Sequence, residues 1–149
     1  MKARNLASPR EMVRPDAPAW DAARILARHD VRAVLVVDEA GAFEGVISDS
    51  ELLRALLPAY VEEAGALAHV LEESASDVLH RRLEARSVAD LMPTDREAVP
   101  VVDADDTLVE VAAAMVRSRA SMVGVLEGGG RLLGGISIDD LVSNLLKPT

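Results

Sequence analysis

The sequence predicts an α/β (α+β) fold made of two tandem β-α-β-β-α repeats with a helical insert between them. Three observations support this fold. Residues 13–57 align with residues 102–146 without a gap at a constant shift of 89, and 13 of the 45 aligned positions are identical. Chance would give about three identities in this composition. Short apolar runs rich in β-branched residues alternate with segments of helical periodicity, and the intervening segment 58–86 has no counterpart in either repeat.

Each repeat begins with a short strand, near 12–14 and 98–102, followed by an acidic turn and a helix over 19–28 or 108–117. Thr107 and Glu110 form a capping-box pattern at the second of these helices, and Pro18 suits the opening turn of the first. Trp20 aligns with Val109, and we expect this pair on a buried helix face.

The runs 33–37 and 122–126 are almost wholly apolar, which is typical of a strand buried on both faces. Glycine-containing turns lead to second strands over 43–47 and 132–136. A closing helix is expected from 49 to about 57, and from 138 to about 146.

Segment 58–86 is expected to form an amphipathic helix, or two helices broken near 74–76. Its apolar stripe packs against its own domain, or else serves as a dimer contact or a lid over a cleft. The stripe contains Tyr60, Ala64, Leu67, Leu71, Ala75, Val78 and Leu83. We therefore predict three parts in one compact pair: a first repeat at 1–57, a helical connector at 58–86 and a second repeat at 87–149.

Composition excludes several classes of function. The net charge of −9 and the few aromatic residues argue against nucleic-acid binding, which needs clustered cations and stacking rings. No apolar run approaches the roughly twenty residues of a membrane span, and the first residues lack the apolar stretch of a signal peptide. The chain has no cysteine. We therefore expect a cytoplasmic protein without disulfides or thiolate metal sites.

Two segments carry the chemistry: Gly-Val-Ile-Ser-Asp-Ser-Glu-Leu at 45–52 and Gly-Ile-Ser-Ile-Asp-Asp-Leu at 135–141. With the repeated β-α-β-β-α unit and Val-Arg-Ala-Val-Leu-Val-Val-Asp-Glu at 31–39, they resemble the CBS domain family. The resemblance implies a domain pair (a Bateman module) with pseudo-twofold symmetry and small mixed sheets flanked by helices. It also implies a homodimer, and a cleft between repeats for AMP, ADP, ATP or S-adenosylmethionine.

The family signature places Ser137 and Asp140 at the ligand, next to Gly135 and Ile136. A hydroxyl and a carboxylate at a helix N-terminus can bind phosphate or ribose oxygens. We expect Val101 and Val123 to sandwich an adenine ring. The same Ser-x-x-Asp pattern is also an ordinary capping box, and the two roles are compatible.

The first copy carries Ser48 and Glu51. The extra methylene of the glutamate would push its carboxylate further into the cleft, so we expect one competent site, or one strong site and one weak site. Arg32 is expected to contact the phosphate, and His29, Arg119 and Arg131 are minor candidates. The histidines show no metal-ligand spacing, and residues 103–106 are interpreted as helix cap and dipole complement.

No nucleophile–base pair or phosphate loop is visible, so we do not expect an enzyme. Two hypotheses remain. In the first, the chain senses an adenosyl ligand and transmits its state to an unidentified partner protein. In the second, the chain is a dimerisation scaffold that has lost its ligand.

Overall fold

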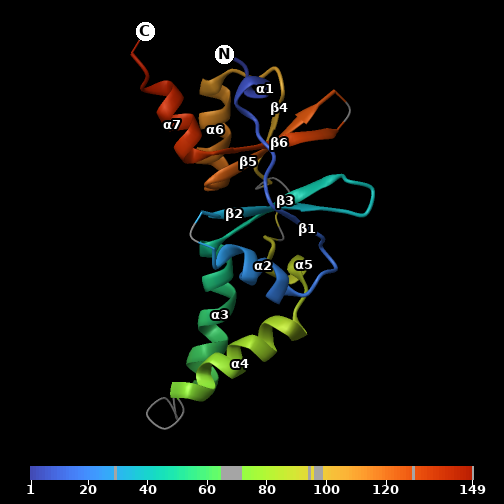
Figure 1. The fold of residues 1–149 in the computed structure, drawn as a ribbon, viewed down its shortest axis with the longest axis vertical. Coiled ribbons are helices and arrows are strands. Elements are labelled where there is room, and N and C mark those ends of the chain that lie inside the picture. The colour runs from blue at the N-terminus through green and yellow to red at the C-terminus, as the bar shows by residue number, and fades with distance from the viewer. Residues whose placement is uncertain (29, 65–71, 94, 96–98, 129, 149) are drawn as a thin grey trace.

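Two three-stranded sheets face each other at the centre of the computed structural model (Figure 1). The structure describes residues 1–28, 30–64, 72–93, 95, 99–128 and 130–148, and for 57–64 and 72–76 the helical backbone alone. In each sheet the first two strands are parallel and the last two antiparallel. The strands are β1 (Met12–Val13), β2 (Ala33–Val37), β3 (Phe43–Ser48), β4 (Val101–Asp103), β5 (Met122–Glu127) and β6 (Arg131–Ser137). The predicted pair of β-α-β-β-α repeats with mixed sheets is confirmed.

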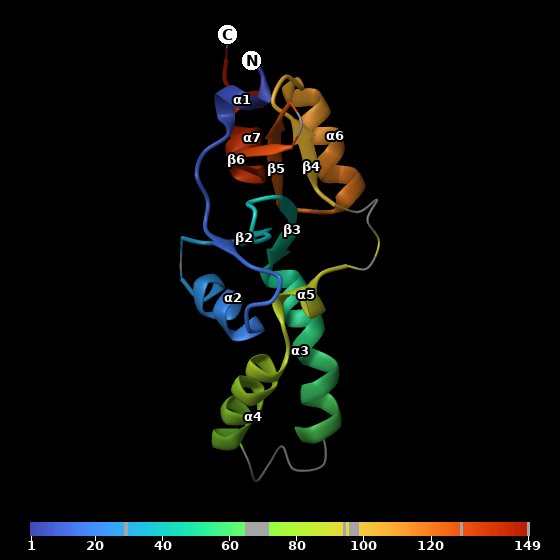
Figure 2. The same cartoon turned by 90° about the vertical axis from the view of Figure 1, so that its right-hand side faces the viewer.

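Helices cover the outer side of each sheet, and a helical hairpin extends beyond the first repeat (Figures 1 and 2). The helices are α1 (Ala3–Leu6), α2 (Ala19–Leu26), α3 (Asp49–Ala64), α4 (Glu72–Ala85), α5 (Val88–Leu91), α6 (Leu108–Ser118) and α7 (Ile138–Leu145). The predicted cap of α6 is present: Thr107 Oγ1 accepts from the Glu110 amide at 3.3 Å, and Glu110 Oε2 accepts from the Thr107 amide at 2.7 Å.

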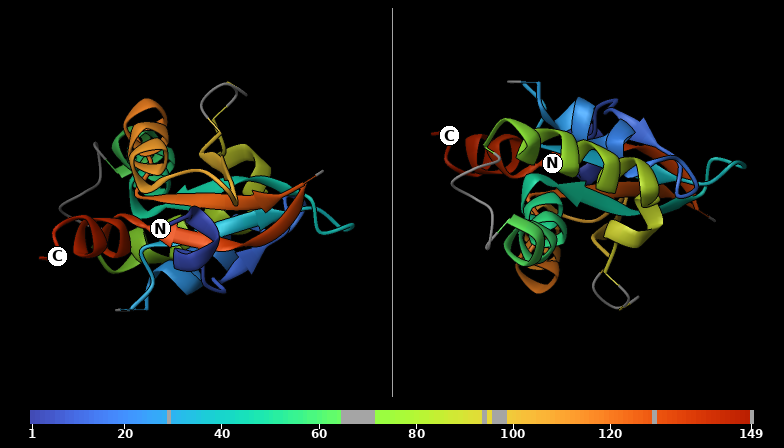
Figure 3. Two further views of the ribbon diagram at one scale, coloured as in Figure 1. Left: turned by 90° about the horizontal axis from the view of Figure 1, so that it is seen from above. Right: turned by 90° about the horizontal axis from the view of Figure 1, so that it is seen from below.

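The core has three parts because each sheet is buried on both faces. One cluster lies between the first sheet and its helices, and a second lies between the second sheet and its helices. The third joins the repeats where the sheets stack, as Figure 3 shows from above and below. It is made of Ala33, Leu35, Val46 and Met122, with Phe43 and Leu132 packed against them. The relative position of the two repeats is therefore set by apolar packing, and the clefts lie at the margins of this contact.

Each repeat gives a short helix to the other. The amide of Ala3 in α1 donates to the carbonyl of Asp106 at 2.8 Å, and Ala3 is fully buried in the core of the second repeat. The amide of Val88 in α5 donates to the carbonyl of Ala17 at 2.8 Å, and Val88 is fully buried in the core of the first repeat. The sequence analysis predicted neither of these four-residue helices. Through this exchange, each core is completed by a residue of the other repeat.

The connector forms two helices, but they do not break where the sequence predicted. Residues 74–76 lie inside α4, so the expected break there is wrong; α3 ends at Ala64 and α4 begins at Glu72. The predicted stripe members Tyr60, Ala64, Leu67, Leu71 and Ala75 lie outside the described side chains. Of the rest, Leu83 is 4% exposed in the core of the first repeat. The α4 helix packs against α2, so this part of the connector covers its own domain.

The expectation that Trp20 and Val109 share a buried environment is wrong for Val109, which is 71% exposed. Trp20 is half-buried because its ring stacks on His80 of α4, with 3.8 Å between ring centroids. Among the residues that the structure describes, none gives the equivalent face of α6 such a cover. None of the helices within the described ranges has the length and apolar character that a membrane span requires.

Candidate ligand clefts between the repeats

Two clefts lie where the strand-to-helix junction of one repeat meets the other repeat. The Asp140 cleft has a volume of about 520 Å³, and the Glu51 cleft about 220 Å³. Clefts for small ligands usually span roughly 300–1,000 Å³, which favours the Asp140 cleft for a whole nucleotide. The Asp140 cleft is lined by Pro9, Arg10, Glu11, Asp30, Val31, Arg32, Ala33, Ser121, Met122, Ser137, Ile138, Asp139 and Asp140.

The junction between β6 and α7 places Ser137 and Asp140 at this cleft. Ser137 is the N-cap of α7, and its Oγ accepts from the Asp140 amide at 3.2 Å. The Asp140 carboxylate also contacts a cation from the N-terminal segment. The hydroxyl therefore caps the helix while the carboxylate faces the cleft.

That cation is Arg10, which the sequence analysis missed. Its Nη2 donates to Asp140 Oδ2 in an ion pair, and its Nε donates to the carbonyl of Gly135 at 3.2 Å. A Cβ on Gly135 would lie 2.9 Å from Arg10 Cγ, so the glycine makes room for this side chain. No pattern in the sequence indicates this contact, because Arg10 precedes the aligned repeat and lies 130 positions from Asp140.

Two opposing effects act on the pKa of Asp140. Partial burial raises the pKa, whereas hydrogen bonds from Arg10 and Ser137 and the positive charge of Arg10 lower it. The lowering effects prevail, so the pKa of Asp140 lies below its ordinary value of 3.8. Asp140 is therefore an anion at neutral pH and can accept hydrogen bonds from hydroxyl groups.

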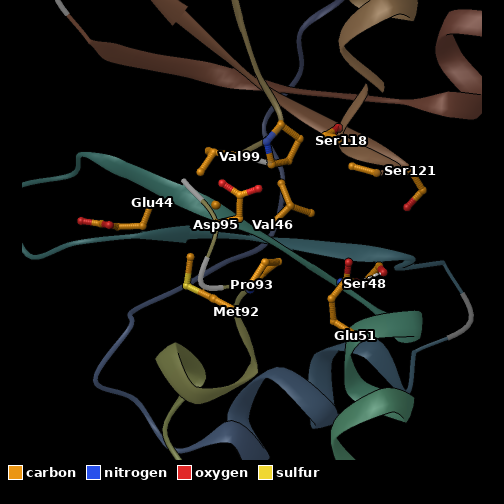
Figure 4. A pocket seen from close by; sticks show the side chains of 13 residues that line it. Glu44, Val46, Ser48, Glu51, Met92, Pro93, Asp95, Val99, Ser118 and Ser121 are labelled. Carbon is orange, nitrogen blue, oxygen red and sulfur yellow. Dashed lines mark hydrogen bonds between the residues drawn. The ribbon is translucent and has the colours of Figure 1, made fainter. Parts of the chain in front are cut away.

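The Glu51 cleft, on the opposite junction, is shown in Figure 4. The sequence analysis expected the Glu51 carboxylate to reach further into the cleft, but it does not. It folds back, and its Oε2 accepts from the Ser48 amide at 2.8 Å and from the Ser48 hydroxyl. An unpaired amide at a helix N-terminus attracts a carboxylate, and the longer side chain can reach it. The lining is Glu44, Gly45, Val46, Ser48, Glu51, Met92, Pro93, Asp95, Val99, Pro100, Ser118, Ala120 and Ser121.

The predicted adenine contacts lie outside both linings. Val123 and Ile136 are 0% exposed in the second core, and a side chain without exposed surface cannot contact a ligand in this conformation. Val101 is 37% exposed on β4, but it does not line a cleft. Gly135 takes part through its carbonyl, which holds Arg10. Apolar lining in the Glu51 cleft comes instead from residues such as Val99 and Met92.

The predicted phosphate partners are scattered. Arg32 lines the Asp140 cleft with its side chain 75% exposed, and its Nε lies 3.9 Å from the Asp139 carboxylate. Arg119 and Arg131 are exposed and line neither cleft. His29 lies outside the described residues. In the same described ranges, no group of three or more His, Asp or Glu side chains is arranged to hold a metal ion.

Comparison with known proteins shows which family the chain resembles. No curated protein sequence matches the chain significantly. A CBS domain-containing protein of unknown function from Kribbella flavida is 33% identical, with full coverage of both chains and a TM-score of 0.77. CBSX2, solved in complex with AMP, is 21% identical over 97% of this chain and 96% of its own, with a TM-score of 0.66.

A third structure, the CBS domain of a CBS domain-containing membrane protein from Sphaerobacter thermophilus, is 23% identical. It covers 98% of this chain and 88% of its own, with a TM-score of 0.69. The CBS domain family profile matches residues 3–58 and 88–147. The duplicated strand–helix unit, the stacked sheets and this match agree: the chain belongs to the CBS domain family and is a CBS domain pair, a regulatory module.

Proposed function

We propose that this CBS domain pair senses an adenosyl compound that binds in the Asp140 cleft. One observation carries the proposal: the cleft is lined from both repeats. Arg32 and Ala33 come from the start of β2, while Ser137 and Asp140 come from the start of α7. A ligand there contacts both halves, so its binding free energy depends on their relative position. Such coupling is typically about 1–3 kcal/mol.

The chemistry of the cleft suits a ribose. The ionised Asp140 carboxylate can accept hydrogen bonds from two neighbouring hydroxyls, and the start of α7 favours negatively charged groups. CBSX2 was solved with AMP, which supports an adenosyl ligand here. AMP, ADP, ATP and S-adenosylmethionine are the candidates. In this proposal the ligand state is read by a partner protein.

The test is thermal unfolding with millimolar AMP, ADP, ATP or S-adenosylmethionine, for the native chain and Asp140→Ala. A ligand at a hundred times its Kd adds about 2.7 kcal/mol to the unfolding free energy. We expect at least one compound to raise the Tm of the native chain and to lose most of this effect in Asp140→Ala. Equal shifts in both proteins would place the ligand elsewhere.

One observation favours the second candidate function, a scaffold without a ligand. Both acids of the signature already have partners within the chain, since Glu51 caps Ser48 and Asp140 pairs with Arg10. If none of the four compounds shifts the Tm, the scaffold becomes the better description.

We also propose that the protein works as a homodimer. Helices α6 and α7 contact each other and carry an apolar outer face. This face consists of Val109, Val116, Ile138, Val142, Leu145 and Leu146, each between 43% and 78% exposed. Clusters of exposed apolar side chains of this kind mark protein interfaces.

A further inference from the structure

We propose that Arg10 makes the Asp140 cleft selective for a phosphorylated ligand, by exchanging Asp140 for the phosphate when the ligand binds. The inference rests on the proposed function and names its ligand class: a nucleotide rather than a neutral nucleoside.

Arg10 pairs with the Asp140 carboxylate, which is the hydrogen-bond acceptor that the ribose hydroxyls would need. Its guanidinium pairs with the Asp140 carboxylate, and its side chain is 22% exposed against 43% for Asp140. The Nε–H of Arg10 is held by the Gly135 carbonyl, which also accepts from the Ser8 amide at 3.1 Å. The aliphatic stem of Arg10 is therefore anchored against β6, while the end of the guanidinium contacts the acid at the cleft.

A nucleotide satisfies both charges once this pair opens. The planar guanidinium can bind two phosphate oxygens at once, and the released carboxylate can accept from the ribose hydroxyls. The ion pair is partly exposed, so water screens it and opening it costs little. A neutral nucleoside offers hydroxyls to Asp140 but gives Arg10 no anion in return. A nucleotide therefore provides partners for both Arg10 and Asp140, whereas a nucleoside provides one for Asp140 alone.

The charge of the Glu51 cleft directs a phosphate to the same place. Its described lining contains the carboxylates of Glu44, Glu51 and Asp95, and no lysine or arginine among those described residues. Like charges repel a phosphate across a small cleft. The Asp140 cleft is also lined by carboxylates, those of Glu11, Asp30, Asp139 and Asp140, but it adds two cations, Arg10 and Arg32. Of the two described linings, that of the Asp140 cleft therefore offers the cations that a phosphate needs.

Titration calorimetry with AMP and with adenosine tests the proposal on the native chain and on Arg10→Met. For the native chain we expect AMP to bind at least about tenfold more tightly than adenosine. In Arg10→Met, AMP binding should weaken by roughly 10- to 100-fold, which is the loss of one charge-assisted contact. Adenosine binding should stay unchanged or become tighter, because Asp140 is then free. This opposite response of the two ligands is the signature of the exchange.

Arg24→Met is the matched control, since it removes the same charge from an exposed site outside both clefts. Arg10→Lys keeps the charge without the planar fork and should fall between the native chain and Arg10→Met; it also serves if Arg10→Met unfolds. Equal changes in AMP and adenosine binding with Arg10→Met, or the same effect from Arg24→Met, overturn the inference alone. No binding of either compound to the native chain overturns the inference; the proposed function is overturned as well if ADP, ATP and S-adenosylmethionine also leave the Tm unchanged.

Discussion

The Asp140 carboxylate links three parts of the molecule that lie far apart in the sequence. Ser137 positions it at the start of α7, Arg10 brings the N-terminal segment to it, and the cleft opens beside it. In the proposed function, Arg10 and a ribose need the same oxygens, so the state of this one side chain would report whether the cleft is occupied.

The lowered pKa of Asp140 has a measurable consequence for stability. A carboxylate with a lower pKa in the folded protein stabilises the fold fully above its unfolded pKa, near 4, and loses this contribution as the pH falls through the folded pKa. Asp140→Asn should therefore reduce the unfolding free energy by up to about 1 kcal/mol at pH 7. The difference from the native chain should shrink once the pH falls below 3.8. Urea unfolding across this pH range measures it.

The neighbouring substitution Asp139→Asn controls for the loss of one carboxylate, because Asp139 is 72% exposed and lies 3.9 Å from Arg32. It should change stability little. A constant difference between Asp140→Asn and the native chain at every pH would contradict the assignment of the ion pair.

At this scale the sequence predicts that Ser137 and Asp140 stand at a helix start, but not what they contact. Ser137 and Asp140 follow from the repeat and its helix start. Arg10 does not, because no local pattern relates it to an acid in the other repeat. The packing of Val123 was also out of reach: a strand buried on both faces gives no alternation that would tell core from cleft.

At the scale of the elements, the N-terminal segment contacts β6 at two glycines, where the strand has no side chains in the way. The amide of Gly135 donates to the Ser8 carbonyl at 2.9 Å. A Cβ on Gly134 would lie 2.4 Å from that same carbonyl oxygen, and φ at Gly134 is +154°. The two glycines of β6 therefore allow the main chain of residue 8 to approach as closely as another strand would.

Gly134→Ala should separate the N-terminal segment from β6 and destabilise the protein by about 1–3 kcal/mol. Hydrogen exchange should show loss of protection at the amides of Ala3 and Ser8. Gly128→Ala is the control, since a Cβ there meets nothing within 4 Å. Full retention of protection at Ala3 in Gly134→Ala would show that α1 is held without this contact.

The sequence could predict the strands because they are short apolar runs next to glycine-containing turns, and the closing helices because they follow these strands in both repeats. It could not predict α1 and α5, since four residues are too few for a helical pattern and their apolar partners belong to the other repeat. Residues 74–76 were misjudged for a related reason: serines favour helix ends, but their position within α4 is set by the whole helix packing on α2.

At the scale of the whole molecule, the two repeats have matching sheets but differ in what covers their outer faces. The insert places α4 over α2, where His80 stacks on Trp20. The same face of α6 carries Val109 and Val116 exposed to 71% and 78%. The second repeat thus leaves uncovered a surface that the first repeat covers with its own chain.

Val116→Glu should dissociate the proposed homodimer, because a charge buried at an apolar interface is unfavourable. Light scattering after size-exclusion chromatography measures the mass. We expect a dimer for the native chain and a monomer for Val116→Glu at micromolar concentration. Ala40→Glu adds the same charge in the exposed β2–β3 turn and should remain a dimer. A dimeric Val116→Glu would move the interface away from this face.

The reciprocal placement of α1 and α5 also limits how such a sensor can move. Neither half can leave its counterpart without withdrawing a fully buried residue, Ala3 or Val88, from the opposite core. Occupation of a cleft can therefore change the tilt of one sheet over the other by a small angle, but it cannot split the molecule. In the proposed function, a partner protein would then have to recognise a slight rotation of intact halves.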